Sequence, residues 1–394
     1  MTAKLADFSK TTQLAASGRS PDPHVVNPPV YRASTHLYEN CAALRKGLAS
    51  NEDGRFFYGR RGSPTQWALA EALTALEPGA DGTVLYPSGV AAIAGALMAV
   101  LNPGDVLLIT DNAYEPSRAM ADGLLKRIGI ETRYFDPLDL DAFPDAFCDR
   151  TRAVLLESPG SLTMEVCDTP ALAKIAREHG AAVLIDNTWA SSLGFTAIRH
   201  GCDIAIQALT KHVGGHSDIM MGSCTAAEPW HGKLRQIAQQ LGHVVSPDDA
   251  ALALRGLRTM ELRLAKSTQS ALAIAEWLAG RAEVAEVLCP MLPGAPGHDL
   301  WQRDFASGCG LFSFTLADAD DAARCRLIDA LTLFGIGYSW GGFESLALPV
   351  DPARIRTATR WPVERLAVRL SIGLEGPADL IADLERGFAA MAGT

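Results

Sequence analysis

From residue 62 onward, segments with helical periodicity alternate with short apolar segments of strand length. The helix-like segments cover residues 67–76, 90–101, 116–128 and 170–179. The strand-like segments between them cover residues 83–86, 106–110 and 153–156. Such alternation is typical of α/β proteins, in which helices connect neighbouring parallel strands and cover the sheet. We therefore expect a mostly parallel sheet flanked by helices.

Two further apolar runs each end in a charged residue. Residues 181–186 end at Asp186, and residues 203–211 end at Lys211. Ligands of an open parallel sheet bind at the carboxyl ends of its strands, so both side chains are expected in one crevice. This pair suits pyridoxal phosphate, whose aldehyde condenses with a lysine amine and whose ring nitrogen stays protonated beside a carboxylate. Taken singly, Lys211 would be read as a solvent-exposed lysine, and Asp186 equally well as a helix cap.

The composition is that of an ordinary globular protein and narrows the possible partners. The chain has 394 residues, a formal net charge of −10 and no basic run, so we expect no nucleic-acid partner. The first residues lack a signal-peptide pattern and no apolar run is long enough to span a bilayer, so the cytoplasm is expected. Eight scattered cysteines favour reduced thiols. His212 and His216 are separated by a Gly-Gly pair, so no metal site is expected.

The chain divides into three parts on these patterns. Residues 1–61 are rich in Pro, Asn and Ser and read as an arm that contacts another subunit. Residues 62–255 hold the alternating segments, with a further strand expected within 219–225. Residues 256–394 are expected to form a smaller α+β domain, with a strand at 310–316 and a closing helix at 377–391. A long helix is expected over 247–278, with a polar interruption at residues 255–258.

Several ordered segments resemble the Cys/Met-metabolism family of pyridoxal-phosphate enzymes, which have the fold-type I transferase-like architecture. The resemblance runs from about Tyr58 to the C-terminus. It rests on Tyr58-Gly-Arg-Arg-Gly, Ala113-Tyr-Glu-Pro-Ser, Glu157-Ser-Pro-Gly-Ser-Leu-Thr-Met-Glu, Asp186-Asn-Thr-Trp-Ala, Ala208-Leu-Thr-Lys-His-Val-Gly-Gly-His-Ser-Asp, Tyr338-Ser-Trp-Gly-Gly-Phe-Glu-Ser-Leu and Val368-Arg-Leu-Ser-Ile-Gly-Leu-Glu. It implies that pyridoxal 5′-phosphate is bound covalently by Lys211, which also takes the substrate's Cα proton, and that Asp186 faces the ring nitrogen.

The same resemblance assigns the remaining cofactor contacts. The amides of Gly89 and Val90, at the start of a predicted helix, and the Thr210 hydroxyl are expected to hold the phosphate, as helix N-termini do. Tyr114 is expected to stack on the ring. Tyr58 and Arg60 lie in a stretch that relatives lend to the neighbouring subunit's phosphate. The resemblance thus implies an active site shared across subunits, in a homo-oligomer that is a dimer of dimers.

The resemblance also implies a substrate site and a reaction. Arg369 is expected to bind the substrate α-carboxylate, with Ser339 and Trp340 beside it, and Arg61 is a candidate for the distal end of the substrate or for an exposed salt bridge. The segments are most similar to family members that cleave L-cystathionine by α,β-elimination, which gives homocysteine, pyruvate and ammonia. They act in methionine biosynthesis, and cystine or cysteine-type thioethers are further possible substrates.

Two other functions stay open at the level of sequence. A γ-acting relative, such as methionine γ-lyase, cystathionine γ-synthase or cystathionine γ-lyase, shares nearly every residue named above. Three residues oppose it, because many γ-acting relatives carry other types there: Trp340, Ala208 and Ser161. A non-catalytic binding protein on the same fold is the remote alternative, and it is opposed by the presence of both Lys211 and Asp186.

Overall fold

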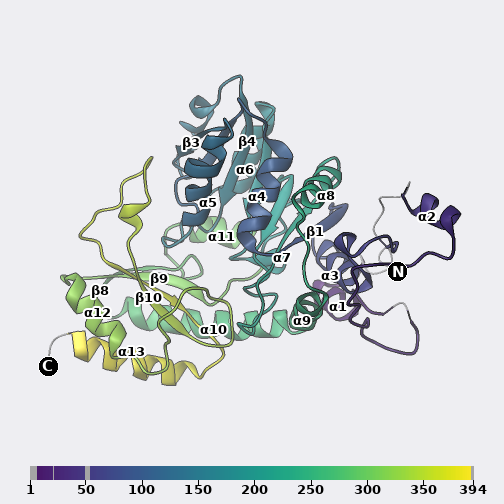
Figure 1. The fold of residues 1–394 in the computed structure, drawn as a ribbon. Coiled ribbons are helices and arrows are strands. Elements are labelled where there is room, and N and C mark those ends of the chain that lie inside the picture. The colour runs from purple at the N-terminus through teal and green to yellow at the C-terminus, as the bar shows by residue number, and fades with distance from the viewer. Residues whose placement is uncertain (1–6, 21, 49–53, 392–394) are drawn as a thin grey trace.

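The computed structural model describes residues 7–20, 22–48 and 54–391, which form two sheets with helices around each (Figure 1). The larger sheet has the strand order β1-β7-β6-β5-β4-β2-β3, and the smaller has the order β10-β11-β9-β8. In the larger sheet only β7 runs antiparallel to its neighbours. The expected α/β fold with a mostly parallel sheet is confirmed.

The strands of the larger sheet are β1 (Gly82–Tyr86), β2 (Val106–Thr110), β3 (Glu131–Phe135), β4 (Thr151–Glu157), β5 (Ala182–Asp186), β6 (Ile204–Gln207) and β7 (Gly222–Ala226). The smaller, antiparallel sheet contains β8 (Val284–Leu288), β9 (Leu311–Leu316), β10 (Leu346–Val350) and β11 (Ala367–Ser371). An antiparallel sheet with helices agrees with the α+β character expected for the C-terminal part. The boundary near residue 255 stays a prediction.

The helices up to residue 258 are α1 (Lys10–Ala16), α2 (Cys41–Leu48), α3 (Pro64–Thr74), α4 (Gly89–Val100), α5 (Glu115–Met120), α6 (Thr169–Glu178), α7 (Ser191–Gly194), α8 (Trp230–Leu241) and α9 (Pro247–Arg258). Those after them are α10 (Met260–Ala279), α11 (His298–Asp304), α12 (Asp321–Asp329) and α13 (Pro377–Met391). Single turns are formed by η2 (Gly59–Arg61), η3 (Ala121–Leu125), η4 (Phe143–Ala146) and η5 (Pro352–Arg354).

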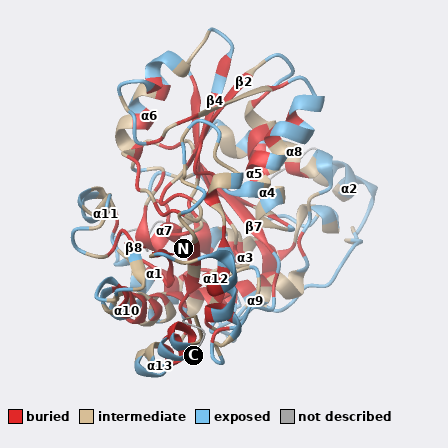
Figure 2. Cartoon of the chain, turned by 90° about the vertical axis from the view of Figure 1, so that its left-hand side faces the viewer, coloured by how far each residue is buried: buried red, intermediate tan, exposed pale blue. Residues whose placement is uncertain are grey.

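The buried inner positions of the central strands β2, β4, β5 and β6 are apolar because helices cover both faces of the larger sheet. In β2, Val106 and Leu108 belong to one apolar core, whereas Leu107 and Ile109 belong to the other. Successive side chains of a strand point to opposite faces, so this division follows from the period of two residues. The strands are accordingly the buried centre of the upper part in Figure 2.

Two expected elements differ from the structure near the Lys211 segment. The strand expected to run to Lys211 ends at Gln207, because the Ala208 N–H donates to Thr188 Oγ1 and the chain then turns. The long helix expected over 247–278 is two helices, α9 and α10, which meet at Thr259, directly after the interruption expected at 255–258. Gly256 lets α9 approach the Lys211 segment, since a Cβ there would lie 2.2 Å from the Val213 carbonyl oxygen.

The helix expected over 116–128 is confirmed, since α5 continues through a π-helical turn, η3, to residue 127. Strands β3, β8 and β10 were not predicted. Each has partly exposed positions, so its sequence lacks the continuous apolar run of a buried strand.

The N-terminal arm lies on one side of the molecule, and α2 stands away from the rest (Figure 1). Its residues 1–6, 21 and 49–53 lie outside the described part. Large apolar side chains on the arm are exposed, among them Val26, Leu37 and Leu48. Over the described ranges, no helix combines the length and apolarity needed to cross a bilayer.

Candidate active site

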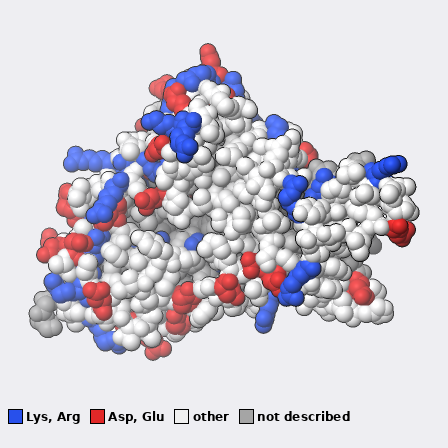
Figure 3. Space-filling view, viewed as in Figure 1, with Lys and Arg blue, Asp and Glu red and all other residues white. Residues whose placement is uncertain are grey.

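A cavity of about 410 Å³ opens at the carboxyl ends of the central strands. The segment 338–340, which precedes β10 of the smaller sheet, forms part of its wall. The cavity has a volume in the range of small-molecule sites. It is lined by nine of the residues expected to act on cofactor or substrate: Gly89, Val90, Tyr114, Asp186, Thr210, Lys211, Ser339, Trp340 and Arg369. Figure 3 shows a hollow between the upper and lower parts, with most charged side chains towards the edge of that face.

Lys211 projects into this cavity from the turn after β6. Its Nζ donates a hydrogen bond of 2.7 Å to Ser339 Oγ and lies 5.3 Å from the centre of the Trp340 ring. Burial lowers the pKa of the amine, the positive charge of Arg369 lowers it further and Asp186 opposes the change, which leaves a pKa of about 8. An amine with this pKa is partly unprotonated near neutral pH, as a nucleophile or base requires.

Asp186 ends β5 and is oriented by Thr188. Thr188 donates both its N–H (3.0 Å) and its hydroxyl (2.5 Å) to Asp186 Oδ1. Burial raises the pKa of the carboxyl, while the bonds from Thr188 and the charge of Lys211 lower it in part. The Asp186 carboxylate is thus held at the cavity wall, where a protonated ring nitrogen would be a better partner than water.

The helix α4 begins at the wall of the cavity. Ser88 caps it by accepting the Ala91 N–H at 3.1 Å, so the Gly89 and Val90 amides are the first-turn donors nearest the cavity. A Cβ on Gly89 would lie 2.7 Å from the Ala208 Cβ, so only glycine allows this approach. The Thr210 hydroxyl bonds to the Met221 backbone, accepting its N–H at 3.0 Å and lying 3.2 Å from its carbonyl oxygen.

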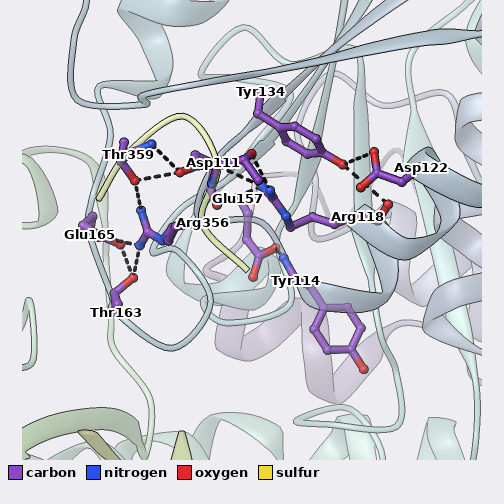
Figure 4. Close-up of polar contacts among 11 residues, drawn as sticks. Asp111, Tyr114, Arg118, Asp122, Tyr134, Glu157, Thr163, Glu165, Arg356 and Thr359 are labelled. Atoms are coloured by element: carbon purple, nitrogen blue, oxygen red, sulfur yellow. Dashed lines mark hydrogen bonds and ion pairs between the residues drawn. The ribbon is translucent and has the colours of Figure 1, made fainter. Parts of the chain in front are cut away.

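Tyr114 lines the cavity from the start of α5, and in Figure 4 its backbone nitrogen meets the Glu157 carboxylate while its ring points away from that contact. The Tyr114 N–H donates to Glu157 Oε2 at 2.6 Å. Burial raises the pKa of the Tyr114 hydroxyl, and the nearby carboxylates Asp186 and Glu157 raise it further. The phenol is therefore neutral near pH 7 in this arrangement.

Arg369, Ser339 and Trp340 come together from two parts of the C-terminal region. Arg369 lies in β11, and its Nη2 donates to the Ser339 carbonyl at 3.1 Å. Ser339 has φ +85°, which residues other than glycine rarely adopt. The Trp340 ring packs edge-on against His212, with ring centres 5.2 Å apart. The Lys211 amine, the Arg369 guanidinium and the Trp340 indole are thereby held around Ser339.

Tyr58, Arg60 and Arg61 do not line the Lys211 cavity of their own chain. Arg60 donates to the Gln239 carbonyl at 2.5 Å, and the Arg61 guanidinium lies 4.1 Å from the centre of the Phe57 ring. Arg60 and Arg61 line a separate cavity of about 90 Å³ beside α3 and α8. The three residues can reach a Lys211 cavity only in another subunit, which stays a prediction.

The sequence reasoning missed Glu157, Thr188 and His212 as members of the site. Glu157 ends β4 opposite Asp186 in the neighbouring parallel strand, so the two carboxylates lie side by side. Burial and the charge of Asp186 raise the pKa of Glu157 well above its usual range. A carboxylate at the end of each of two adjacent strands was the signal that could have found it. Among the described residues, no group of three metal-binding side chains is placed to hold an ion.

The donor set of this cavity fits pyridoxal phosphate. The cavity wall provides an amine, a carboxylate and the first-turn amides of a helix, whose close approach depends on Gly89 because a Cβ there would collide with Ala208. Lys211 would hold the aldehyde carbon, Asp186 the ring nitrogen, and Gly89 and Val90 the phosphate.

Comparison with known proteins agrees with this chemistry. A "Putative cystathionine beta-lyase" of Rhizobium johnstonii is 46% identical over 386 residues, covering 96% of each chain, and the "Cystathionine beta-lyase MetC" of Escherichia coli is 41% identical, covering 98% of this chain and 99% of its own. The crystal structure of a cystathionine gamma synthase from Xanthomonas oryzae pv. oryzae in complex with cystathionine superposes with a TM-score of 0.89 at 32% identity, covering 98% and 99% of the two chains. The model of the family described as "Cys/Met metabolism PLP-dependent enzyme" matches residues 11–389. With so much of the chain matched, it belongs to this family of pyridoxal-phosphate-dependent enzymes.

Proposed function

We propose that this enzyme cleaves L-cystathionine by α,β-elimination, giving homocysteine, pyruvate and ammonia. The observation that carries the proposal is the grouping of Lys211, Ser339, Trp340 and Arg369 around one point of the cavity. The two lyase relatives support the choice of substrate. Methionine biosynthesis in the cytoplasm is the proposed setting, and related thioethers such as cystine are proposed as further substrates.

The proposed roles follow from the charges at the cavity wall. Arg369 binds the substrate α-carboxylate, because a guanidinium stays protonated in proteins and its planar fork donates two hydrogen bonds to a carboxylate. Burial lowers the pKa of Arg369. Lys211 then removes the Cα proton, and Ser339 directs the amine by accepting its hydrogen bond. The bound cofactor, when present, supplies an electron sink for the resulting carbanion. Loss of the sulfur from Cβ releases homocysteine, and water converts the remaining carbon skeleton to pyruvate and ammonia.

Trp340 favours elimination at the β-carbon. A γ-elimination needs a second proton removed, from Cβ, so its base must move along the substrate. Here the Lys211 amine is bonded to Ser339, and the Trp340 ring lies beside it and packs against His212. The ring therefore limits the movement that a γ-acting enzyme requires.

The proposal includes a site shared between subunits. Tyr58 and Arg60 would bind the phosphate in the neighbouring subunit, and Arg61 would contact the distal end of the substrate there. The exposed apolar side chains of the arm support this, since large exposed apolar patches are typical of interfaces. The proposed assembly is a homotetramer built as a dimer of dimers. Each chain is proposed to consist of the arm 1–61, a cofactor-binding part 62–255 and a C-terminal part 256–394.

Product analysis tests the proposed function. Purified enzyme loaded with cofactor is incubated with L-cystathionine, and the keto acid and thiol are identified by mass spectrometry. Pyruvate with homocysteine supports β-elimination. Predominant 2-oxobutyrate with cysteine would instead make it a γ-acting enzyme, and the absence of any keto acid would favour a binding protein.

A further inference from the structure

The connection between β10 and β11 extends far from the sheet that it joins. These strands are antiparallel neighbours, which a two-residue turn could connect. Residues 351–366 instead rise beside the larger sheet, as the yellow-green loop of Figure 1 shows. Long connections with little regular structure often carry a function.

Its first contact is with Asp111, the residue directly after β2. This carboxylate is fully buried and accepts the N–H and hydroxyl of Thr357 (2.9 and 3.2 Å) and of Thr359 (both 2.7 Å) (Figure 4). Burial by itself would raise the pKa of Asp111, but the bonds from Thr359 and from the backbone of residues 357–359 lower it to about 2. Asp111 is therefore a permanent anion to which the connection is bound.

Asp111 and Arg118 flank Tyr114 in sequence and are paired in space. Arg118 Nη1 lies 3.0 Å from Asp111 Oδ1, and its Nη2 donates to Thr357 Oγ1 at 2.7 Å. The Arg118 guanidinium also stacks on the Tyr134 ring at 3.7 Å, and its backbone N–H donates to the Tyr114 carbonyl at 3.2 Å. The turn 111–118, which carries Tyr114, is thus held at its two ends by the contact between Asp111 and Arg118.

The second contact is made by Arg356, whose side chain is only 5% exposed. Its Nη2 donates to Glu165 Oε1 at 2.6 Å and to Thr163 Oγ1, and its Nη1 donates to Thr359 Oγ1 at 3.0 Å. Glu165 closes a loop at residues 160–165, because its carbonyl accepts the Gly160 N–H at 2.9 Å. Arg356 therefore holds this loop from the side away from the cavity.

The loop at 160–165 forms a wall of the active-site cavity and is conformationally strained. Gly160, Ser161, Leu162 and Met164 line the cavity. Leu162 has φ +68° and Met164 has φ +60°, values that cost free energy for these residues. Such strain persists only where surrounding contacts enforce it, and the Arg356 contacts to Thr163 and Glu165 are of this kind.

We propose that Arg356 is a positioning residue for the reaction: by binding Thr163 and Glu165 it holds the strained 160–165 wall against the substrate, while Thr357 and Thr359 anchor the same connection on Asp111. The inference rests on the proposed lyase function for its kinetic test. Loss of Arg356 should let the wall relax, which weakens substrate binding and misplaces the reacting bond, as small displacements in a site do.

The test compares Arg356→Gln with Arg354→Gln in the cofactor-loaded enzyme. Arg354 is the matched control, because it lies two residues away with a side chain that is 82% exposed. We expect kcat/KM for cystathionine, per cofactor-loaded site, to fall at least about tenfold in Arg356→Gln and to stay unchanged in Arg354→Gln. Arg356→Lys should recover part of the loss, since it keeps the charge but cannot bind Thr163, Glu165 and Thr359 together.

Hydrogen exchange of the wall gives a readout independent of activity. The Gly160 and Met164 amides, which are bonded within the loop, should exchange faster in Arg356→Gln than in the parent, while amides of β5 stay unchanged. A folded Arg356→Gln with parental exchange and parental kcat/KM overturns the proposal. If that variant does not fold, Thr163→Val, which removes one Arg356 partner, is judged by the same two criteria.

The two proposals fail in different ways. A parent enzyme that releases no keto acid from cystathionine refutes the lyase function but leaves the exchange comparison valid. An active parent in which Arg356→Gln changes neither the exchange of the 160–165 amides nor kcat/KM refutes the positioning role alone.

Discussion

The Lys211 amine donates to the Ser339 hydroxyl at 2.7 Å, a contact between residues 128 positions apart in the chain. The Ser339 carbonyl in turn accepts from Arg369 Nη2 at 3.1 Å. One serine with an unusual backbone conformation therefore connects the proposed base with the proposed carboxylate clamp. A substrate carboxylate bound by Arg369 would bring its Cα hydrogen towards the amine.

The reactivity of Lys211 should follow its lowered pKa. Because only the neutral amine attacks the cofactor aldehyde, the rate of covalent loading of cofactor-free enzyme should rise with pH and level off above about pH 8, rather than near the ordinary lysine value of about 10.4. Stopped-flow absorbance from about pH 6 to about pH 10 measures this. Arg369→Met should move the plateau to higher pH, since a charge that lowers the lysine pKa is lost. A parent rate still rising at about pH 10 would contradict the prediction.

Asp186→Asn should keep the fold but slow the chemistry. The amide can still accept from the Thr188 N–H, so local geometry is retained. It cannot stabilise a protonated ring nitrogen, so exchange of the substrate Cα hydrogen with deuterated solvent should slow at least about tenfold with saturating cofactor. Asp141→Asn, at an exposed position, is the control. Parental exchange rates in Asp186→Asn would refute the pairing.

Mixed oligomers should reveal a shared site. Lys211→Ala and Arg60→Ala chains should each be nearly inactive alone. If Arg60 serves the neighbouring subunit, a mixed dimer has one intact site, so random mixing should restore up to about a quarter of the parent activity. Mixing Lys211→Ala with Asp186→Asn is the control, because both residues line the cavity of one chain. No recovery in mixed dimers verified by mass spectrometry would rule out the cross-subunit role.

A buried carboxyl far from the site should make stability depend on pH. Burial raises the pKa of Glu77 to about 7, although Ser192 and the charge of Lys10 lower it in part. The protonated form is favoured in the folded chain, so this contribution to stability is complete below the unfolded value of about 4.3 and is lost as the pH rises through about 7. Glu77→Gln stays neutral and should gain stability relative to the parent between about pH 5 and about pH 8, by on the order of 2 kcal/mol.

Thermal unfolding at the two pH values measures the effect of Glu77→Gln. Glu71→Gln, at an exposed position on α3, should show no such pH-dependent gain. An equal difference between Glu77→Gln and the parent at both pH values would show that Glu77 does not titrate as argued.

Local sequence patterns were sufficient for the sheet and for the residues that end its strands. The continuous apolar runs of β2, β4 and β5 predicted buried parallel strands, because both faces of such strands are covered. The positions of Asp186 and Gly89 followed from strand ends and helix starts, which have local signals. The edge strands β3 and β8 were not predicted, because partly exposed strands lack the continuous apolar run of a buried strand.

The sequence by itself therefore determined the family, most of the larger sheet and nine of the residues that line the cavity. Only the tertiary structure decided which of them touch: that Ser339 meets Lys211, that Glu157 lies opposite Asp186, and that Arg356 reaches the 160–165 loop. It also placed Tyr58, Arg60 and Arg61 outside their own chain's cavity. Such contacts join segments far apart in the chain, and their partners depend on how the two sheets and the long connection pack rather than on any local pattern.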